Sequence, residues 1–364
     1  NYELIADADL YSDAGLSENH EELGKLFIEL VRTRGQIAKA KGYENYMDMS
    51  YACDFKRDYT TAEARGFMGL VKEKLAPMME YTKITGICSY YSSWNESKWE
   101  EMLSTAAEKT GGPIWESCRF LLEHELYDFS YSSKKLNIGY TDYIDNYEAP
   151  VIFVDPSGRD LVYTLFHEFG HFTDFYRNYG FSESYEIAET YSQAMQYLAF
   201  AYSEPFSDRD RNTNLRATLS DLLVYAVLRE AAFADFELQV YSLPADELTQ
   251  EKLDEVYAQC IKDYGLEDEG SIWTNEKFWI ASSHFFSYPG YVISYSVSAV
   301  AALQICRMEA EEPGAGVDAY LRLLDRTRGK KFAAVIEEAE LDSPFEAETI
   351  EKTAEFLSGA FELN

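Results

Sequence analysis

Apolar residues recur at helical spacing through most of this 364-residue chain, with polar residues between them. Amphipathic helices are predicted over residues 21–41, 61–81, 113–127, 161–176, 184–202 and 215–241, the last as one long helix or a broken pair. Pro113 suits the first turn of its helix, whereas Pro77 predicts a kink or a break inside the second helix. The pattern therefore predicts a mainly α fold.

Two short segments do not follow the helical pattern and predict a small β-sheet. Residues 150–154 form an apolar run typical of a buried strand, and residues 134–139 predict a strand that pairs with it. A turn at 155–158 and Asp160, a residue suited to the N-cap, lead into the helix at 161–176. We expect the free edge of the 150–154 strand to hydrogen-bond an extended peptide.

The helix at 161–176 contains the pattern His-Glu-Phe-Gly-His. His167 and His171 lie four residues apart and hence on one helix face, where both imidazoles can reach a single metal ion. Glu168 can reach a water molecule on that metal and act as general base. A helical histidine pair without a metal is the alternative, and the flanking strand, turn and helix favour a catalytic zinc site.

A catalytic zinc ion needs a third protein ligand and one open position for water. Residues 184–202 predict the next helix, which can pack antiparallel against the first after a short loop. Glu189 lies one turn inside this helix and is the candidate third ligand, with Glu183 and Glu186 as rivals. Spacing alone leaves the choice among these three carboxylates open.

Several motifs in order along the chain resemble the thimet oligopeptidase and oligoendopeptidase F family of zinc peptidases. The zinc motif is followed by Glu189-Thr190-Tyr191-Ser192-Gln193 and by a segment rich in histidine and tyrosine at residues 284–295. The family resemblance also covers residues 34–38, 42–46, 320–324 and 339–344. It therefore extends from about residue 22 to the C-terminus.

The resemblance implies a zincin-type helical metallopeptidase with a small β-sheet beside the active-site helix and two lobes around a cleft. It implies His167, His171 and Glu189 as the ligands of one Zn²⁺ per chain, which makes this an HExxH enzyme with a glutamate third ligand (a gluzincin). Glu168 would activate the zinc-bound water. The expected activity is that of a metalloendopeptidase that hydrolyses internal peptide bonds of short oligopeptides.

Residues 284–295 resemble the loop that lies over the cleft in that family. His284, Tyr291 and Tyr295 could donate hydrogen bonds to the oxyanion as it develops on the substrate. Pro289-Gly290 is a turn signal, and the glycine is typical of a loop that moves or approaches another segment closely.

The chain departs from the family pattern at two positions and at its start. Members usually carry an acidic residue seven positions after the third ligand, where this chain has Gln196. One tyrosine of the cleft loop in the mammalian-type enzymes falls on Ser298. The sizeable helical region that precedes the matched part in the family is also lacking. The first departure is expected to weaken zinc binding and the second to reduce oxyanion stabilisation.

Composition excludes some classes of function. Acidic residues number 64 against 32 basic ones, a net charge of −32, which argues against nucleic-acid binding because that needs a basic surface. No apolar run is long enough to span a bilayer. Five scattered cysteines without a CxxC pair are typical of free thiols in a reducing compartment, so we expect a cytoplasmic protein.

No Gly/Ser-rich linker divides the chain, so we expect residues 1–364 to form a single zinc-peptidase catalytic region. Within it, residues 1–130 would contribute helical lobe and residues 131–364 the zinc site and cleft. Short peptides are the expected partners, with no nucleic acid and no membrane, and the sequence does not indicate an oligomeric state.

Two alternatives stay open beside the endopeptidase. The first is a carboxypeptidase-like or dipeptidase-like exopeptidase on the same scaffold. The second is a catalytically impaired peptide-binding relative, which the departures at Gln196 and Ser298 favour. The intact His167-Glu168-His171 set argues against it, because a protein without catalysis does not need the base.

Overall fold

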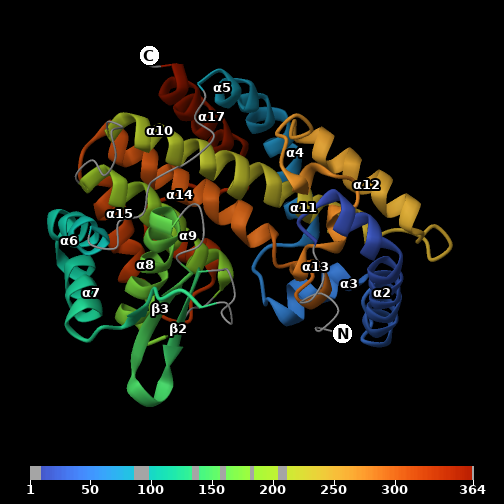
Figure 1. Ribbon diagram of the computed structural model, residues 1–364, viewed down its shortest axis with the longest axis horizontal. Helices are drawn as coiled ribbons and strands as arrows, with labels where there is room; N and C mark the ends of the chain where they lie inside the picture. The colour runs from blue at the N-terminus through green and yellow to red at the C-terminus, as the bar shows by residue number, and fades with distance from the viewer. Residues whose placement is uncertain are drawn as a thin grey trace. The chain divides into compact units, whose positions relative to one another are not determined.

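The computed structural model describes residues 10–85, 98–132, 139–155, 161–180, 184–203 and 211–362 (Figure 1). The chain separates into two compact units: unit 1 comprises residues up to 79 together with 224–296, and unit 2 comprises residues 80–223 together with 297 onward. The subdivision at residue 130 that the sequence predicts is not tested by these boundaries and stays a prediction.

The regular secondary structure among the described residues of unit 1 is all helical. Its elements are α2 (Asp13–Ala40), α3 (Tyr46–Met49), the π-helical η1 (Ser50–Asp54), α4 (Thr61–Leu70), the π-helical η2 (Val71–Leu75), the 3₁₀ turn η3 (Ala76–Met78), α11 (Arg229–Val240), α12 (Gln250–Asp263), the 3₁₀ turns η6 (Ile272–Thr274) and η7 (Phe278–Ile280), and α13 (Ser283–Ser287). The break at Pro77 predicted from the sequence is confirmed, because η3 carries this proline in its first turn.

The core of unit 1 joins segments that are far apart in the sequence. Phe27 on α2 is fully buried, and its ring lies 5.4 Å from Trp279 of η7 and 5.2 Å from Phe286 of α13, centroid to centroid. Phe236 on α11 stacks on the same phenylalanine at 6.4 Å. These aromatic contacts hold α2 against both later segments of the unit.

Unit 2 contains the sheet and the two helices that carry the predicted metal ligands. Its elements are α6 (Trp99–Thr110), α7 (Gly112–Glu123), β1 (Tyr127–Asp128), β2 (Gly139–Ile144), the 3₁₀ turn η4 (Asp145–Tyr147), β3 (Ala149–Val154), α8 (Leu161–Asn178), α9 (Tyr185–Tyr202), α10 (Arg211–Asp221), α15 (Ala315–Leu324), α16 (Phe332–Glu338) and α17 (Ala347–Glu362). Three further elements cross a boundary between the units: α5 (Met79–Thr85), the π-helical η5 (Leu222–Leu228) and α14 (Ile293–Glu311).

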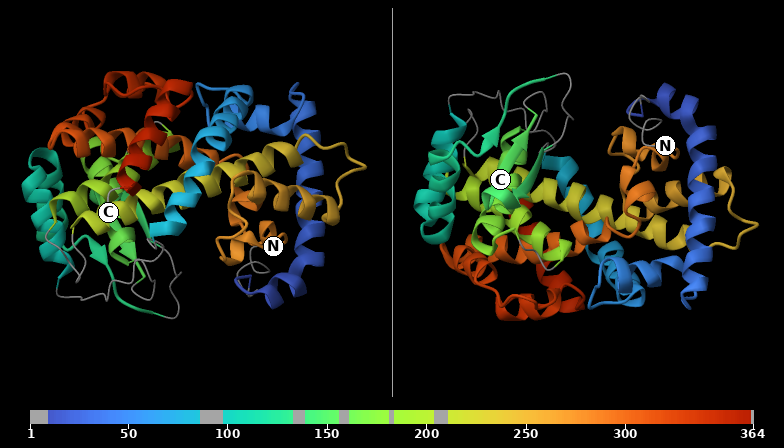
Figure 2. Two further views of the ribbon diagram at one scale, coloured as in Figure 1. Left: turned by 90° about the horizontal axis from the view of Figure 1, so that it is seen from above. Right: turned by 90° about the horizontal axis from the view of Figure 1, so that it is seen from below.

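The sheet has the strand order β1-β3-β2 and packs against α8 (Figures 1 and 2). β3 pairs antiparallel with β2, with Gly139 opposite Val154, and parallel with β1. The prediction that β3 has a free edge was therefore wrong: β3 is the central strand, and within the described residues β2 pairs only with β3. Of the strand predicted at 134–139, only Gly139 lies in the described residues, so most of that prediction is not tested. The strand that pairs antiparallel with β3 is Gly139–Ile144.

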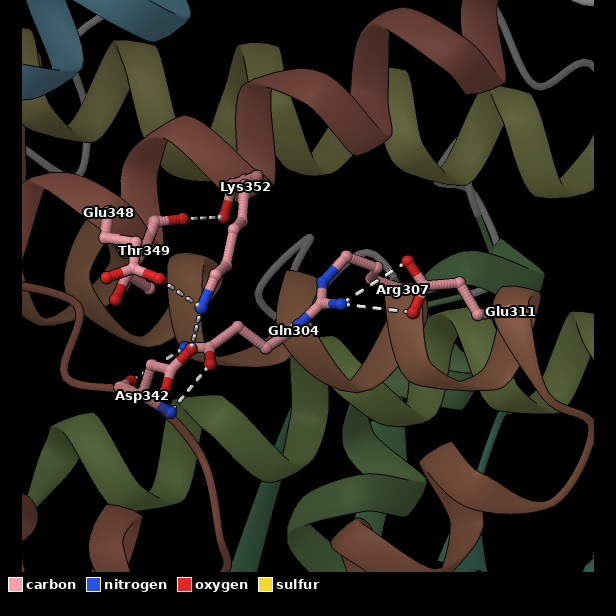
Figure 3. Close-up of polar contacts among 8 residues, drawn as sticks. Gln304, Arg307, Glu311, Asp342, Glu348, Thr349 and Lys352 are labelled. Atoms are coloured by element: carbon pink, nitrogen blue, oxygen red, sulfur yellow. Dashed lines mark hydrogen bonds and ion pairs between the residues drawn. The ribbon is translucent and has the colours of Figure 1, made fainter.

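A pair of polar contacts ties the C-terminal segment of unit 2 to α14. The side chain of Gln304 donates to the Asp342 carbonyl at 2.9 Å and accepts from the Asp342 amide at 2.8 Å (Figure 3). Lys352 on α17 contacts the carboxylates of Asp342 at 3.1 Å and Glu348 at 2.9 Å. The segment at 339–344 thus links α14 to α17 through Asp342.

None of the helices in the described ranges combines the length and the apolar character that crossing a bilayer requires. Four cysteines fall in the described ranges and none of them is in a disulfide; Cys118, Cys260 and Cys306 are buried, and Cys53 is exposed. Cys88 lies outside the described residues. Burial raises the pKa of the Cys118 thiol to about 12, which makes it a poor nucleophile.

Candidate metal centre

Helix α8 places both histidines of the motif on one face, as their spacing predicts. The two imidazole rings lie 4.9 Å apart, centroid to centroid, and at 80° to one another. Their side chains remain 22 % and 15 % exposed, so small molecules can reach the pair. The turn at 156–158 and the N-cap candidate Asp160 lie outside the described residues.

Helix α9 brings a carboxylate to the same point. Glu189 Oε2 lies 3.4 Å from His167 Nε2 and 3.8 Å from His171 Nε2. The carboxylate is almost fully buried, and the hydroxyl of Ser192 donates to its Oε2 atom at 3.2 Å. Helix α9 begins at a conventional cap, because the Ser184 hydroxyl accepts from the Ile187 amide.

A glycine sets how closely the two helices approach. A Cβ atom on Gly170 would lie 2.5 Å from the Ser192 Cα atom and 2.7 Å from the Tyr191 carbonyl oxygen, far inside any tolerable contact. The α8 and α9 backbones therefore approach closely at Tyr191 and Ser192, which follow Glu189 on α9. The fourth residue of the His-Glu-Phe-Gly-His pattern is required by packing.

Glu168 is held from the sheet. The Thr141 hydroxyl on β2 lies 2.8 Å from the Glu168 carboxylate and 2.9 Å from the Glu168 carbonyl oxygen, and donates to both. Gly139, on the same face of β2, has no room for a Cβ atom, which would lie 2.4 Å from Thr164 and 3.1 Å from Glu168 Oε1. The inward face of β2 thus fixes the position of the general-base candidate.

The surroundings of the site shift the pKa values of its groups. Burial raises the pKa of Glu168 to about 7, although His167 and the Thr141 hydroxyl act in the opposite sense. Burial lowers the pKa of His171 to about 4. Burial also lowers the pKa of His167, but the hydrogen bond and the charge of Glu189 outweigh it and leave that pKa raised. A neutral His171 has the protonation state of a metal ligand.

The donor set fits a zinc ion. One ligand atom from each of His167, His171 and Glu189 can be chosen so that all lie within 4.8 Å of one another. Around a tetrahedral zinc ion, with ligand distances of about 2.0–2.1 Å, donor atoms lie about 3.3 Å apart. The separations of 3.4 and 3.8 Å between the carboxylate and the two imidazoles are close to this value.

Of the two rival carboxylates, only Glu186 lies in the described residues. Glu186 is buried on α9 but does not belong to the cluster of potential ligands, and Glu183 lies outside the described residues. Gln196, seven positions after Glu189 on α9, is buried. Its hydrogen bond with His167 helps to raise the pKa of that histidine. Ser298 is buried as well, and its hydroxyl donates to the Gln193 side chain at 3.0 Å.

A buried ion pair, which the sequence analysis missed, connects α8 and α9. Arg326, just after α15, donates to Asp174 on α8 at 2.6 Å and to the Tyr191 hydroxyl on α9 at 2.8 Å. Both charged side chains are at most 1 % exposed. Asn178 also donates to Asp174, at 2.8 Å. Removing one partner of a buried ion pair costs about 3–5 kcal/mol. The contacts of Arg326 therefore hold α8 and α9 in place relative to one another.

The histidine and the two tyrosines of the 284–295 segment come together in unit 1. The His284 ring stacks on Tyr291 at 5.2 Å and 11°, and lies edge-on to Tyr295 at 6.0 Å. The two tyrosine rings are 5.1 Å apart. The three side chains thus form one aromatic cluster within unit 1, and their role toward the substrate stays a prediction.

Replacing Thr141 should affect the general-base candidate without affecting the metal. We expect Thr141→Val to lower kcat by about ten- to a hundredfold, because a hydrogen bond to a charged group contributes roughly 1.5–3 kcal/mol. Thr141→Ser keeps the hydroxyl and should restore most of the loss. The measurements are kcat, KM and bound metal for the three proteins. A valine variant with wild-type kcat would show that Thr141 does not position Glu168.

A model of the family described as peptidase family M3 matches residues 125–355, more than half of the chain. Comparison with curated proteins finds no match.

Three solved structures share the fold. PZ peptidase A, solved with an inhibitor, is 22 % identical with a TM-score of 0.84, and the match covers 98 % of this chain and 74 % of that one. A protein described as an oligoendopeptidase F is 23 % identical with a TM-score of 0.82, over 96 % of this chain and 67 % of its own. An oligoendopeptidase F described from Bacillus anthracis str. Ames is 23 % identical with a TM-score of 0.79, and the match covers 96 % of this chain and 65 % of that one.

At these identities the structural likeness shows a common fold, which is the mainly helical architecture with a small sheet expected from the sequence. The family match covers the zinc motif, both helices that carry it and the 284–295 segment. The chain belongs to peptidase family M3, a family of metallopeptidases.

Proposed function

We propose that the chain is a zinc-dependent metallopeptidase that hydrolyses internal peptide bonds of short oligopeptides. The observation that carries this proposal is the convergence of His167, His171 and Glu189 beside the buried carboxylate of Glu168. Two imidazoles and one carboxylate are a donor set of catalytic zinc sites, which keep one position open. Membership of a peptidase family supports the reaction class.

His167, His171 and Glu189 would hold the metal. When bound, zinc would lower the pKa of a water molecule and polarise the scissile carbonyl. Glu168 would take a proton from the attacking water and pass it to the leaving amine, a role suited to a buried carboxyl group beside the metal ligands. The hydroxyl of Thr141 orients the carboxylate during both transfers.

The outer edge of β2 is suited to bind the substrate. β2 carries Gly139 and Thr141, which contact α8 beside Glu168, and in the described residues it pairs on one side only. An extended peptide can add to such an edge through backbone hydrogen bonds, which places its carbonyl groups without reading its sequence. This arrangement favours peptides of varied composition.

The aromatic cluster of His284, Tyr291 and Tyr295 would stabilise the oxyanion. Imidazole N–H and phenol O–H groups are donors that can stabilise the charge that develops on the carbonyl oxygen. The mutual stacking of these rings supports the assignment, because it restricts each donor to a narrow range of orientations.

The test combines metal content with cleavage. The purified protein should contain about one zinc ion per chain and cleave an internally quenched peptide. Removing the metal with a chelator should abolish cleavage, and adding zinc should restore it. Glu189→Ala should lose most of its bound zinc, whereas Glu186→Ala, which changes a buried glutamate one turn away, should keep it.

Blocking both ends of the peptide separates the two peptidase classes. An endopeptidase cleaves the blocked peptide as well as the free one, whereas an exopeptidase fails on it. Cleavage that survives complete removal of the metal would overturn the proposed function. So would a protein that binds no zinc at micromolar concentrations of the ion.

A further inference from the structure

The 284–295 segment of unit 1 is held at its start by Arg34 of α2. The Arg34 guanidinium donates to the carbonyl oxygens of Phe285, at 3.2 Å, and Phe286. It also donates to the Tyr241 hydroxyl at 3.0 Å. A planar guanidinium that binds two successive carbonyls fixes the backbone that carries His284.

The turn in the middle of the segment is held from two sides. The buried hydroxyl of Ser50 donates to the Pro289 carbonyl at 3.0 Å. The Gly290 amide donates to both carboxylate oxygens of Glu237 on α11, at 3.0 and 3.1 Å. Gly290 has φ +91, and a Cβ atom there would lie 3.1 Å from Met47. Only glycine suits both the conformation and the space.

Arg57 holds the end of the segment. Its guanidinium donates to the Ser294 hydroxyl at 2.7 Å, and both side chains are buried. It also lies over the rings of Tyr51, at 4.3 Å, and Phe55, at 4.4 Å. The Phe55 ring in turn contacts Tyr291, 6.3 Å between centroids. The Phe55 ring therefore lies between the Arg57 guanidinium and Tyr291 and contacts both.

Glu237 interacts with the Gly290 amide and with the charges of both arginines. It is 1 % exposed, and burial raises its pKa to about 8, against the effect of the Gly290 amide and the positive charges of Arg57 and Arg34. The negative charge of Glu230 acts in the same sense as burial. Keeping an acid in such a place is costly, so its contacts must be well satisfied. Here the carboxylate accepts from the Gly290 amide of the segment, and the charges of Arg57 and Arg34 stabilise its ionised form.

We propose that Glu237 is a positioning residue, which through the Gly290 amide fixes the 284–295 backbone and thereby the donor directions of His284 and Tyr291. This inference rests on the proposed function for its kinetic consequence, but not for the anchoring itself. Glu237 does not belong to the cluster of potential metal ligands. Its effect on the reaction would be wholly through the segment.

The anchoring is measured without turnover, by amide hydrogen exchange. Glu237→Ala should raise exchange in the peptide that covers residues 284–295, at Gly290 first, because that amide loses its acceptor. Glu237→Gln keeps an acceptor oxygen of the same reach and should retain most of the protection. Unchanged exchange of the segment in a folded Glu237→Ala protein would overturn the anchoring.

The kinetic consequence is measured on the same variants, per bound zinc ion. Glu237→Ala should lower kcat about 10- to 100-fold and leave KM within about threefold, because small displacements of catalytic groups cost up to about 10² in rate. Glu237→Gln should restore kcat. The matched control is Asp235→Ala, which removes another buried acid of α11, paired with Lys72 at 2.9 Å. It should lower stability and leave both segment exchange and kcat unchanged.

The two measurements separate the two proposals. A loss of protection with unchanged kcat would show that the segment is anchored by Glu237 but that its orientation does not affect the reaction, which overturns the positioning role. An inactive wild-type protein whose segment loses protection in Glu237→Ala would overturn the proposed function and leave the anchor supported. An equal fall of kcat in Asp235→Ala would reduce the effect to general stability.

Discussion

Glu168→Gln is expected to bind zinc like the wild type and to lose turnover. The amide fills the same space, can still accept from the Thr141 hydroxyl, and removes a carboxyl group that burial makes costly to ionise. It has no basic site for the proton of the attacking water. General acid–base catalysis contributes about 10²–10⁴-fold, so we expect kcat to fall at least by that range with KM little changed.

The control for this prediction is Glu186→Gln, an isosteric change of a buried acid on α9 that belongs to no ligand cluster. It should keep wild-type kcat and wild-type zinc. Thermal unfolding of both variants shows whether the fold is intact. If Glu168→Gln retained more than about a tenth of wild-type kcat, another group would be the base.

The helices of the site could be predicted because their buried faces are long. α8 and α9 agree closely with the predicted ranges 161–176 and 184–202. In α8 the buried rings of Phe166, Phe169 and Phe172 repeat at intervals of three, which is the clearest signal that an amphipathic helix gives. The histidine spacing then placed two potential ligands on a known face without any tertiary information.

The strand β2 was harder to place because its exposed face is only partly polar. Its residues alternate between half-buried and exposed, but the exposed positions include Tyr140 and Ile144. Tyr140 lies opposite Phe153 of β3 and stacks on it at 5.0 Å. This cross-strand pair stabilises the hairpin yet removes the apolar–polar alternation that predicts a strand from sequence.

The residues that orient the site were missed because their contacts are not local. Thr141 and Glu168 are 27 positions apart, and Asp174 and Arg326 are 152 apart. No spacing rule connects such pairs, since they meet only after the sheet and the helices have packed. A buried charged pair shows in the sequence only as one more aspartate and one more arginine.

The structure shows what residues of the N-terminal motifs at 34–38 and 42–46 contact. The sequence offered residues 34–38 and 42–46 only as a resemblance. In unit 1, Arg34 binds carbonyl groups of the 284–295 segment, and the helix that follows Asn45 supplies Met47 against Gly290. Segments about 250 residues apart in the chain are therefore parts of one packing unit.

Gly170→Ala is expected to separate α8 from α9 and thereby to weaken metal binding. The added Cβ atom would lie 2.5 Å from the Ser192 Cα atom, and because that atom belongs to the backbone, no side-chain rotation can relieve the contact. Overpacking of this kind costs about 1–3 kcal/mol. Moving α9 away also withdraws Glu189 from His167 and His171, so zinc affinity should fall by at least about tenfold.

The matched control is Gly66→Ala on α4, where no atom lies within 4 Å of the added Cβ atom. There the same substitution should stabilise the protein by up to about 1 kcal/mol, because alanine loses less backbone entropy than glycine in a helix. Chemical unfolding of the metal-free proteins and competition with a zinc chelator measure the two effects. If Gly170→Ala matched Gly66→Ala in both, the close approach of α8 and α9 would not be what assembles the metal centre. A fall in stability with unchanged zinc affinity would assign the glycine to packing alone, because Glu189 would then keep its place while the helices adjust elsewhere.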